Sequence, residues 1–191
     1  ESPVVRAFTD SDLAGCVDTR LSRSGGAALL GTHLLKHWAS TQKKITLSSG
    51  EAELAAVMSF SEVLGLQSVA RDLGVEFKPE VHADSSAAIG ICNRCGIGKV
   101  RHLAVAQLWV QDLVRSKRCR LFKVLGTENP ADLMTKPLAR TEIDGHLRRL
   151  GLTRATGRAE TAPPADANVD TTLADHTARP RAAHHPPPVV P

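Results

Sequence analysis

Four carboxylates of this chain stand where a folded chain can bring distant residues together. Asp10 ends an apolar run typical of a strand, and Asp84 ends a second, shorter one. Glu53 lies near the start of a long helical pattern, and Asp132 lies at the start of another. Acids that meet at one point repel each other unless cations neutralise them. Hard divalent ions prefer oxygen ligands, so the pattern predicts an acidic metal site, and Mg²⁺ suits phosphate chemistry.

Two of these acids have competing interpretations in the sequence. Asp84 precedes Ser85 and a helical pattern, so helix capping is the alternative for it. Near Glu53, the pattern Ser48-x-x-Glu51 is a capping box, which gives Glu51 a structural role. Glu53 lies two residues on, about 200° around the helix axis, on the face that points to the sheet. We therefore choose Glu53 as the metal ligand.

The remaining patterns predict strands first and then alternating helices and strands, which favours one mixed sheet covered by helices. Predicted strands cover residues 4–9, 25–31, 34–38, 78–83 and 119–124, with a tight turn at 31–33. Predicted helices cover residues 49–73, 85–93, 101–117, 130–136 and 140–149, with Pro130 at the first position of its helix.

The helix predicted over 49–73 has an apolar face made of Leu54, Val57, Met58, Val69 and Leu73. Small residues at positions 61 and 65 are expected to let this helix lie close to the sheet. Gly74 is the predicted C-cap.

Composition divides the chain into a folded part and a tail. We predict a folded domain over 1–140, a short C-terminal helix over 141–153 and a disordered tail over 154–191. Seven of the eleven prolines and no aromatic residue lie in that tail, which cannot bury enough apolar area to offset its ordering entropy. The chain begins with Glu rather than Met, so we expect a fragment or a processed product.

Charge and cysteine content limit the class of protein. The net charge of +4 and the pI near 9.1 are compatible with a polyanionic substrate beside metal ions. Four cysteines are too few for a disulfide scaffold, so we expect reduced thiols and an intracellular protein. No apolar run reaches the roughly eighteen residues of a membrane span.

Several motifs, in this order, resemble one known family. Four stretches carry the resemblance: FTDSDLAG at 8–15, DTRLSRSGGAALLG at 18–31, TLSSGEAELAAV at 46–57 and VLGTENPADLMTKPL at 124–138. VHADSSAAI at 81–89 and GKVRHLAVAQLW at 98–109 support it. The chain resembles the ribonuclease H domain at the C-terminal end of the Pol polyprotein of copia-type retrotransposons. The resemblance covers about residues 4–140.

This resemblance implies an α/β ribonuclease H-like fold with a five-stranded mixed sheet, flanking helices and the disordered tail. It implies a metal-dependent endonuclease that hydrolyses the RNA strand of RNA–DNA hybrids during reverse transcription. Two Mg²⁺ ions, which Mn²⁺ can replace, are the implied cofactors. The implied partners are the hybrid and the reverse transcriptase domain of the same polyprotein, with no membrane, in a cytoplasmic particle or the nucleus. The implied catalytic and metal-binding residues are Asp10, Glu53, Asp84 and Asp132.

Substrate contacts are expected from small polar groups that reach the 2′-hydroxyls of the RNA strand. The candidates are Ser11, Ser24, Ser48, Ser49, Ser85 and His102. His102 departs from the family pattern in its surroundings, because Ala104 stands where an acid usually follows. Leu13 replaces the Trp that is most frequent in the first motif. Basic clusters at 94–101 and 115–120 are candidates for phosphate binding or for a solvated face.

Two other functions stay open at this point. A decayed or domesticated transposon relic could keep the fold and at most bind nucleic acid. A strand-transfer nuclease of the same fold would use three acids and act on DNA ends. Metal titration and the choice of substrate separate these alternatives.

Overall fold

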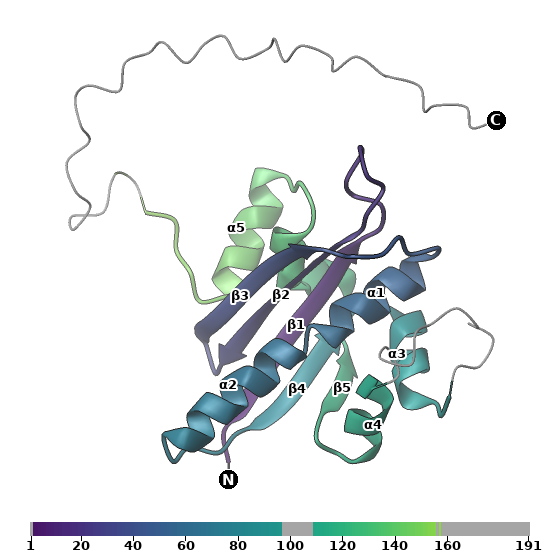
Figure 1. Ribbon diagram of the computed structural model, residues 1–191. Helices are drawn as coiled ribbons and strands as arrows, with labels where there is room; N and C mark the ends of the chain where they lie inside the picture. The colour runs from purple at the N-terminus through teal and green to yellow at the C-terminus, as the bar shows by residue number, and fades with distance from the viewer. Residues whose placement is uncertain (1, 97–108, 156, 158–191) are drawn as a thin grey trace, which may run out of the picture. The chain divides into compact units, whose positions relative to one another are not determined.

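The structure is a computed structural model, and it describes residues 2–96, 109–155 and 157. Its centre is a five-stranded mixed sheet with the strand order β3-β2-β1-β4-β5 (Figure 1). β1 pairs antiparallel with β2 and parallel with β4, β2 pairs antiparallel with β3, and β4 pairs parallel with β5. The strands are β1 (Val4–Asp12), β2 (Arg23–Leu30), β3 (His33–Thr41), β4 (Lys78–Ala83) and β5 (Arg120–Lys123). This confirms the predicted fold class.

Helices cover the sheet, and all of the helices predicted from the sequence have a counterpart in the described residues. The α-helices are α1 (Ser49–Met58), α2 (Ser61–Asp72), α3 (Ser86–Asn93), α4 (Trp109–Arg115) and α5 (Arg140–Arg149). Two short 3-10 helices, η2 (Gly126–Glu128) and η3 (Pro130–Met134), stand before α5. Residues 101–108, which the sequence assigns to the start of the fourth helix, lie outside the described residues.

The main core lies between one face of the sheet and helices α1 to α4. In β1, the odd-numbered residues Val5 and Ala7 are fully buried and face Leu54 and Val57 of α1. The alternation follows from the two-residue period of a strand, which sends successive side chains to opposite faces. With few aromatic residues available, this core is filled mainly by Val, Leu and Ala.

The long helix predicted over 49–73 is two helices. The indole nitrogen of Trp38 donates a hydrogen bond to the Ser59 hydroxyl at 2.9 Å, and that hydroxyl donates to the Ala56 carbonyl at 2.5 Å. Serine hydroxyls that bond back to the preceding turn bend helices, and here the chain turns so that Phe60 becomes fully buried.

This break changes which residues of α2 face the sheet. Val69 and Leu73, predicted on the buried face, are 58% and 76% exposed, and Gly65 is exposed as well. Val63 is the fully buried residue of α2 instead. The C-cap of α2 is Leu73 rather than the predicted Gly74, which follows it: Gly74 has a φ of 76°, and its N–H donates to the Arg71 carbonyl at 2.9 Å.

A smaller core lies on the other face of the sheet, under η3 and α5. Ala27 and Leu29 of β2 are buried there against Leu150, which follows α5. Phe8 of β1 and Leu133 of η3 pack around them. Because successive side chains of a strand point to opposite faces, β1 and β2 present apolar side chains on both faces of the sheet. Those on this face hold η3 against the sheet.

Contacts between residues separate the chain into two compact units, Glu1–Arg154 and Ala155–Pro191. α5 packs on η3 and belongs to the first unit. The tail predicted as disordered lies outside the described residues except for 154, 155 and 157. All four cysteines are free thiols. Within the described ranges, no helix has the length and apolar character needed to cross a membrane.

Candidate metal centre

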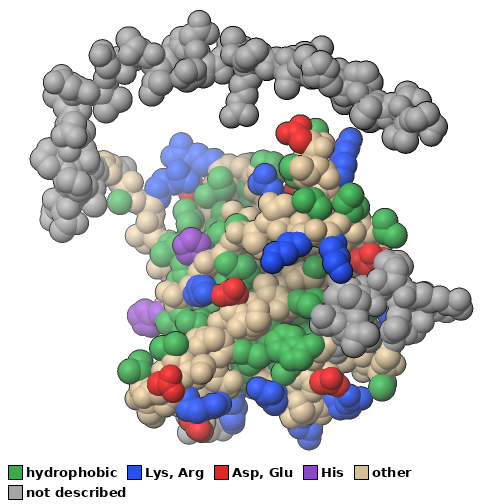
Figure 2. Space-filling model, viewed as in Figure 1, with side chains coloured by type: hydrophobic (Ala, Val, Ile, Leu, Met, Phe, Trp, Pro, Cys, Tyr) green, Lys and Arg blue, Asp and Glu red, His purple; other side chains and the backbone are tan. Residues whose placement is uncertain are grey.

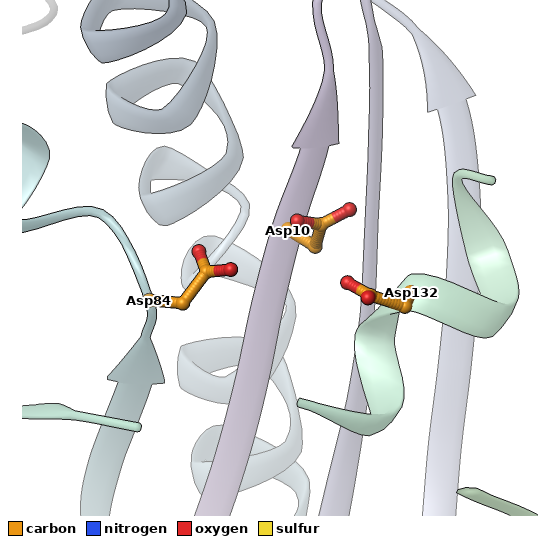
Figure 3. Close-up of side chains that lie close together, drawn as sticks. All are labelled: Asp10, Asp84 and Asp132. Atoms are coloured by element: carbon orange, nitrogen blue, oxygen red, sulfur yellow. The ribbon is translucent and has the colours of Figure 1, made fainter. Parts of the chain in front are cut away.

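Three of the four predicted acids meet at one edge of the sheet. Asp10 lies near the end of β1, and Asp84 directly follows β4, the parallel neighbour whose last residue pairs with Thr9. Asp132 comes from η3, which lies across β1 and β2. Asp10 stands between Asp84 and Asp132 (Figure 3), and one carboxylate oxygen of each lies within 4.8 Å of the others. Parallel strands end at the same edge, which explains the first pair.

The segment that carries Asp132 is fixed by a buried asparagine. The Asn129 amide donates to the Thr9 carbonyl of β1 at 2.9 Å, and its oxygen accepts from the Ala131 N–H at 3.2 Å. Asn129 is fully buried and caps η3, while Pro130 supplies the fixed φ of a first helical position. One side chain therefore both starts η3 and joins it to the strand of Asp10.

The close packing of η3 on β2 also depends on a glycine in β2. Gly25 pairs with Asp10 in the sheet register. A Cβ atom at Gly25 would lie 2.5 Å from the Met134 Cβ and 2.7 Å from the Thr135 Cγ2, which is too close for any real contact. Glycine at this position thus lets Asp132 reach Asp10.

Asp84 is not the cap of the helix that follows it. The cap of α3 is Ser85, whose hydroxyl accepts from the Ala88 N–H at 3.2 Å. The chain after β5 passes close by, since a Cβ at Gly126 would lie 3.2 Å from an Asp84 carboxylate oxygen. The capping interpretation of Asp84 loses its basis, and its half-buried carboxylate faces the other acids.

Glu53 adjoins the three aspartates but is not a member of their close group. Its Oε1 accepts from the Ser11 hydroxyl at 2.8 Å and from the Ser11 N–H at 3.3 Å. Its Oε2 is buried and has no hydrogen-bond partner among the described residues. Burial, and then the charge of Asp10, raise the pKa of Glu53 to about 7. The Glu51 N–H donates to the capping Ser48 hydroxyl at 3.3 Å, and the Glu51 carboxylate accepts from that hydroxyl and from the Leu47 N–H. Glu51 thus has a capping role at the start of α1, and Glu53 as the metal ligand stays a prediction.

Two aspartates of the group also have raised pKa values. Burial and the neighbouring Asp10 carboxylate raise the pKa of Asp132 to about 6, although Lys136 opposes the rise. The pKa of Asp84 is raised by the same two causes, against Lys136 and Lys123. The site therefore holds more negative charge than its own cations neutralise.

Lys136 and Thr135 belong to the centre, and the sequence argument missed both. The Lys136 ammonium lies 3.0 Å from Asp10 Oδ1 and 3.1 Å from Asp132 Oδ1. The Thr135 hydroxyl donates to Asp10 Oδ2. Although burial lowers the pKa of Lys136, its bonds to the two aspartates raise it more. The i,i+4 spacing of Asp132 and Lys136 on a helical pattern was a usable signal.

Most of the predicted substrate-binding serines already have partners within the protein. Ser11 binds Glu53, Ser24 accepts from the Gln42 amide, and Ser48 and Ser85 cap helices. Ser49, the first residue of α1, is exposed. His102 lies outside the described residues. A substrate role for these six residues stays a prediction.

The second basic cluster predicted for phosphate binding lies at the other end of β5. Arg115 binds Asp112 of its own helix, and Arg120, the first residue of β5, binds Glu80 of β4. The acids of the metal site lie near the opposite ends of the strands, so this basic cluster is about one strand length away from them. Lys99 and Arg101 of the first cluster are outside the described residues.

The donor set suits a hard divalent ion. All four candidate ligands are carboxylates, three of them converge, and Glu53 Oε2 is a buried acceptor for which the described residues supply no donor. A buried carboxylate oxygen without a donor is costly unless a cation binds it. Calcium and magnesium both prefer oxygen ligands, so the residues do not choose between them.

Similar proteins of known sequence are polyproteins of plant transposons. The chain is 30% identical over 145 residues to the retrovirus-related Pol polyprotein from transposon TNT 1-94 of Nicotiana tabacum, covering 74% of this chain and 11% of the relative. It is 30% identical over 154 residues to the corresponding polyprotein from transposon RE1 of Arabidopsis thaliana, covering 78% of this chain and 10% of the relative. Its homologues are retrovirus-related Pol polyproteins of plant transposons. The chain spans about a tenth of their length. No family model matches it.

Solved structures show the same fold. LC11-RNase H1, isolated from compost by a metagenomic approach, matches with a TM-score of 0.52 at 14% identity, over 70% of this chain and 93% of that one. The same enzyme in complex with an RNA/DNA hybrid matches with a TM-score of 0.50 at 16% identity, over 69% of this chain and 93% of that one. The fold of this Pol-related chain is therefore ribonuclease H-like.

Proposed function

We propose that the chain is a nuclease of the ribonuclease H type that hydrolyses the RNA strand of RNA–DNA hybrids with divalent metal ions. The observation that carries the proposal is the convergence of Asp10, Asp84 and Asp132 within 4.8 Å, beside the orphaned Glu53 oxygen, at the strand ends of this fold. Retrotransposon homology supports the same function, because reverse transcription produces RNA–DNA hybrids.

The four acids would together bind two divalent ions. Mg²⁺ is the expected ion, and Mn²⁺ could replace it. Asp10, in the middle of the group, would contact both ions; Asp84 and Glu53 would complete one site, and Asp132 the other. Two bound ions would supply an activated water and stabilise the leaving 3′ oxygen. Thr135 orients the Asp10 carboxylate, and Ser11 orients that of Glu53.

Hybrid binding by this chain is expected to be weak without its polyprotein neighbours. On the face seen in Figure 2, Lys and Arg side chains lie in separate groups with acidic side chains among them, rather than in one continuous basic surface. Phosphate contacts dominate nucleic-acid affinity, so the face seen in Figure 2 offers a hybrid few adjoining phosphate contacts. We propose that the reverse transcriptase domain of the same polyprotein supplies the rest, in a cytoplasmic particle or the nucleus.

The decisive experiment is cleavage of an end-labelled RNA–DNA hybrid with Mg²⁺ or Mn²⁺ by the wild-type protein and by Asp84→Asn. We expect metal-dependent cutting of the RNA strand that falls by about a thousandfold or more in the variant, because a ligand that stabilises transition-state charge is lost. Asp112→Asn is the matched control, since Asp112 is an exposed residue of α4 paired only with Arg115 in the described structure.

Two other outcomes count against the proposal. Absence of cutting with either metal, in a protein whose circular dichroism shows it folded, would favour a catalytically inactive relic or a domain that needs its polymerase partner. Cutting of duplex DNA in preference to the hybrid would favour a strand-transfer nuclease of the same fold.

A further inference from the structure

The two oxygens nearest to Lys136 belong to different elements of the site. Its ammonium group bridges Asp10 Oδ1 of β1 and Asp132 Oδ1 of η3 at 3.0 and 3.1 Å. Asp10 is fully buried and Asp132 largely so, whereas the Lys136 side chain is 34% exposed. The ammonium group thus bonds to both carboxylates, although a third of the Lys136 side chain is exposed.

The group of acids therefore has two halves, and within the described structure only one of them contains a positively charged side chain that forms ion pairs with its carboxylates. Between Asp10 and Asp132, the ammonium of Lys136 is already present. On the other side of Asp10, towards Asp84 and Glu53, no cation forms an ion pair with a carboxylate in the described part of the chain, and Glu53 Oε2 has no donor. A metal ion entering the half of Asp84 and Glu53 meets carboxylates that no described cation pairs, while one entering the other half meets the pair that Lys136 already bridges.

We propose that Lys136 is a built-in cation that holds the Asp10–Asp132 half together in the metal-free protein and competes there with the second metal ion. The inference rests on the proposed metal site but not on the nature of the nucleic acid. It makes metal binding sequential: the first ion binds at Asp10, Asp84 and Glu53, and the second binds only when the ammonium leaves the aspartates.

The surroundings give Lys136 a place to move to. Its side chain lines an open groove, which Asp12, Arg23, Thr135 and Pro137 also line. Rotation of the long side chain into that groove keeps the ammonium in solvent and removes it from Asp10. Arginine at this position would keep the charge and the bridge, and methionine would keep the stem without the charge.

Titration calorimetry with Mg²⁺ and with Mn²⁺ tests the competition on the full chain without any nucleic acid. We expect two steps for the wild-type protein, the second weaker, and a second step about tenfold tighter in Lys136→Met, because no resident cation has to be displaced. Lys136→Arg should retain the weak second step. Lys123→Met is the matched control, since Lys123 lies near Asp84 but bonds to Ser86.

Thermal unfolding in EDTA supplies the second readout. We expect the melting temperature of Lys136→Met to fall below that of the wild type, since two buried carboxylates lose their shared partner, and that of Lys136→Arg to stay close to it. Lys136→Gln serves as a second uncharged variant if the methionine variant does not fold.

The proposal is overturned if the uncharged variants bind the second ion no more tightly than the wild type, or if their melting temperature in EDTA is unchanged. If that happens while the wild-type protein still cuts the hybrid and Asp84→Asn does not, the role of Lys136 fails and the proposed function stands. Absence of metal binding in every variant would reject both.

Discussion

At the scale of single residues, the site is an arrangement of acids that the fold holds against their mutual repulsion. Asp10 and Glu53 are buried, and both have a hydroxyl donor, Thr135 for one and Ser11 for the other. Hydrogen bonds of this kind fix the direction of a carboxylate before any ion arrives. These hydrogen bonds supply no positive charge, and burial together with the neighbouring Asp10 raises the pKa of Glu53 to about 7.

The raised pKa of Glu53 predicts a specific pH dependence of stability in the absence of metal. The pKa of Glu53 rises from 4.5 to about 7 on folding, so the folded protein binds more protons than the unfolded chain between those values. Its free energy of unfolding should therefore fall as the pH rises from about 4.5 to 7, by at most about 3 kcal/mol from this group. Chemical denaturation in EDTA across this range measures the slope.

Glu53→Gln should flatten this slope, and Glu76→Gln should not, because Glu76 is exposed in the segment before β4. Metal binding favours the charged carboxylate, so added Mg²⁺ should also flatten the slope. Equal slopes for the wild type and Glu53→Gln would show that Glu53 ionises normally in the folded protein.

At the scale of elements, η3 is the piece whose position decides whether the site exists. Its five residues make a short 3-10 helix with little stability of its own. Asn129 ties it to β1, Leu133 and Met134 pack it against β2, and α5 covers it. Tertiary contacts therefore hold the segment in place, and the position of Asp132 depends on them.

Two glycine substitutions are expected to change the stability of the protein in opposite directions. The first tests the position of η3, and the second is a comparison in α2. Gly25→Ala should destabilise the protein by about 1–3 kcal/mol and reduce metal binding, since its Cβ would lie 2.5 Å from the Met134 Cβ and push η3 away. Gly65→Ala should stabilise it by roughly 0.5–1 kcal/mol, because Gly65 is exposed inside α2 with no atom within 4 Å of the new Cβ. Urea denaturation and metal titration measure both.

A Gly25→Ala protein as stable as the wild type, with unchanged metal affinity, would show that η3 can shift without loss of the site. If Gly65→Ala destabilised the protein, α2 would pack more closely than the described contacts indicate.

At the scale of the whole molecule, the site lies where the sheet changes from antiparallel to parallel pairing. β1 has antiparallel β2 on one side and parallel β4 on the other, and helices cover both faces of this junction. Ligand sites of open α/β sheets lie at such points, outside the carboxyl ends of the strands. Residues that build this junction all belong to the unit Glu1–Arg154.

A chain that ends at Arg154 should therefore keep both the fold and the metal site. We expect its melting temperature to lie within about 2 °C of that of the full chain, and its affinity for Mg²⁺ to be unchanged, because the core residues and all four acids remain. Differential scanning calorimetry and metal titration of the two proteins make the comparison. A drop of several degrees would assign a stabilising role to residues 155–191.

Sequence patterns were enough to predict the five strands and the positions of Asp10 and Asp84 near the strand ends, and to choose Glu53 over Glu51 as the candidate ligand. These depend on local rules: alternation in strands, capping boxes and the helical period. The prediction of one helix over 49–73 was wrong, because the break at Ser59 depends on Trp38 of another strand.

The groups that complete the site became evident from the packing of distant segments. Lys136, Thr135 and Asn129 contact β1 over sequence separations of 120 or more residues, and no local pattern predicts these contacts, although the i,i+4 spacing points to the pair of Lys136 with Asp132. The serines predicted for substrate show the same limit: a hydroxyl is polar in any sequence, but its neighbours decide whether it is already bonded. The sequence determines local conformation, and the packing of distant segments determines which charges meet.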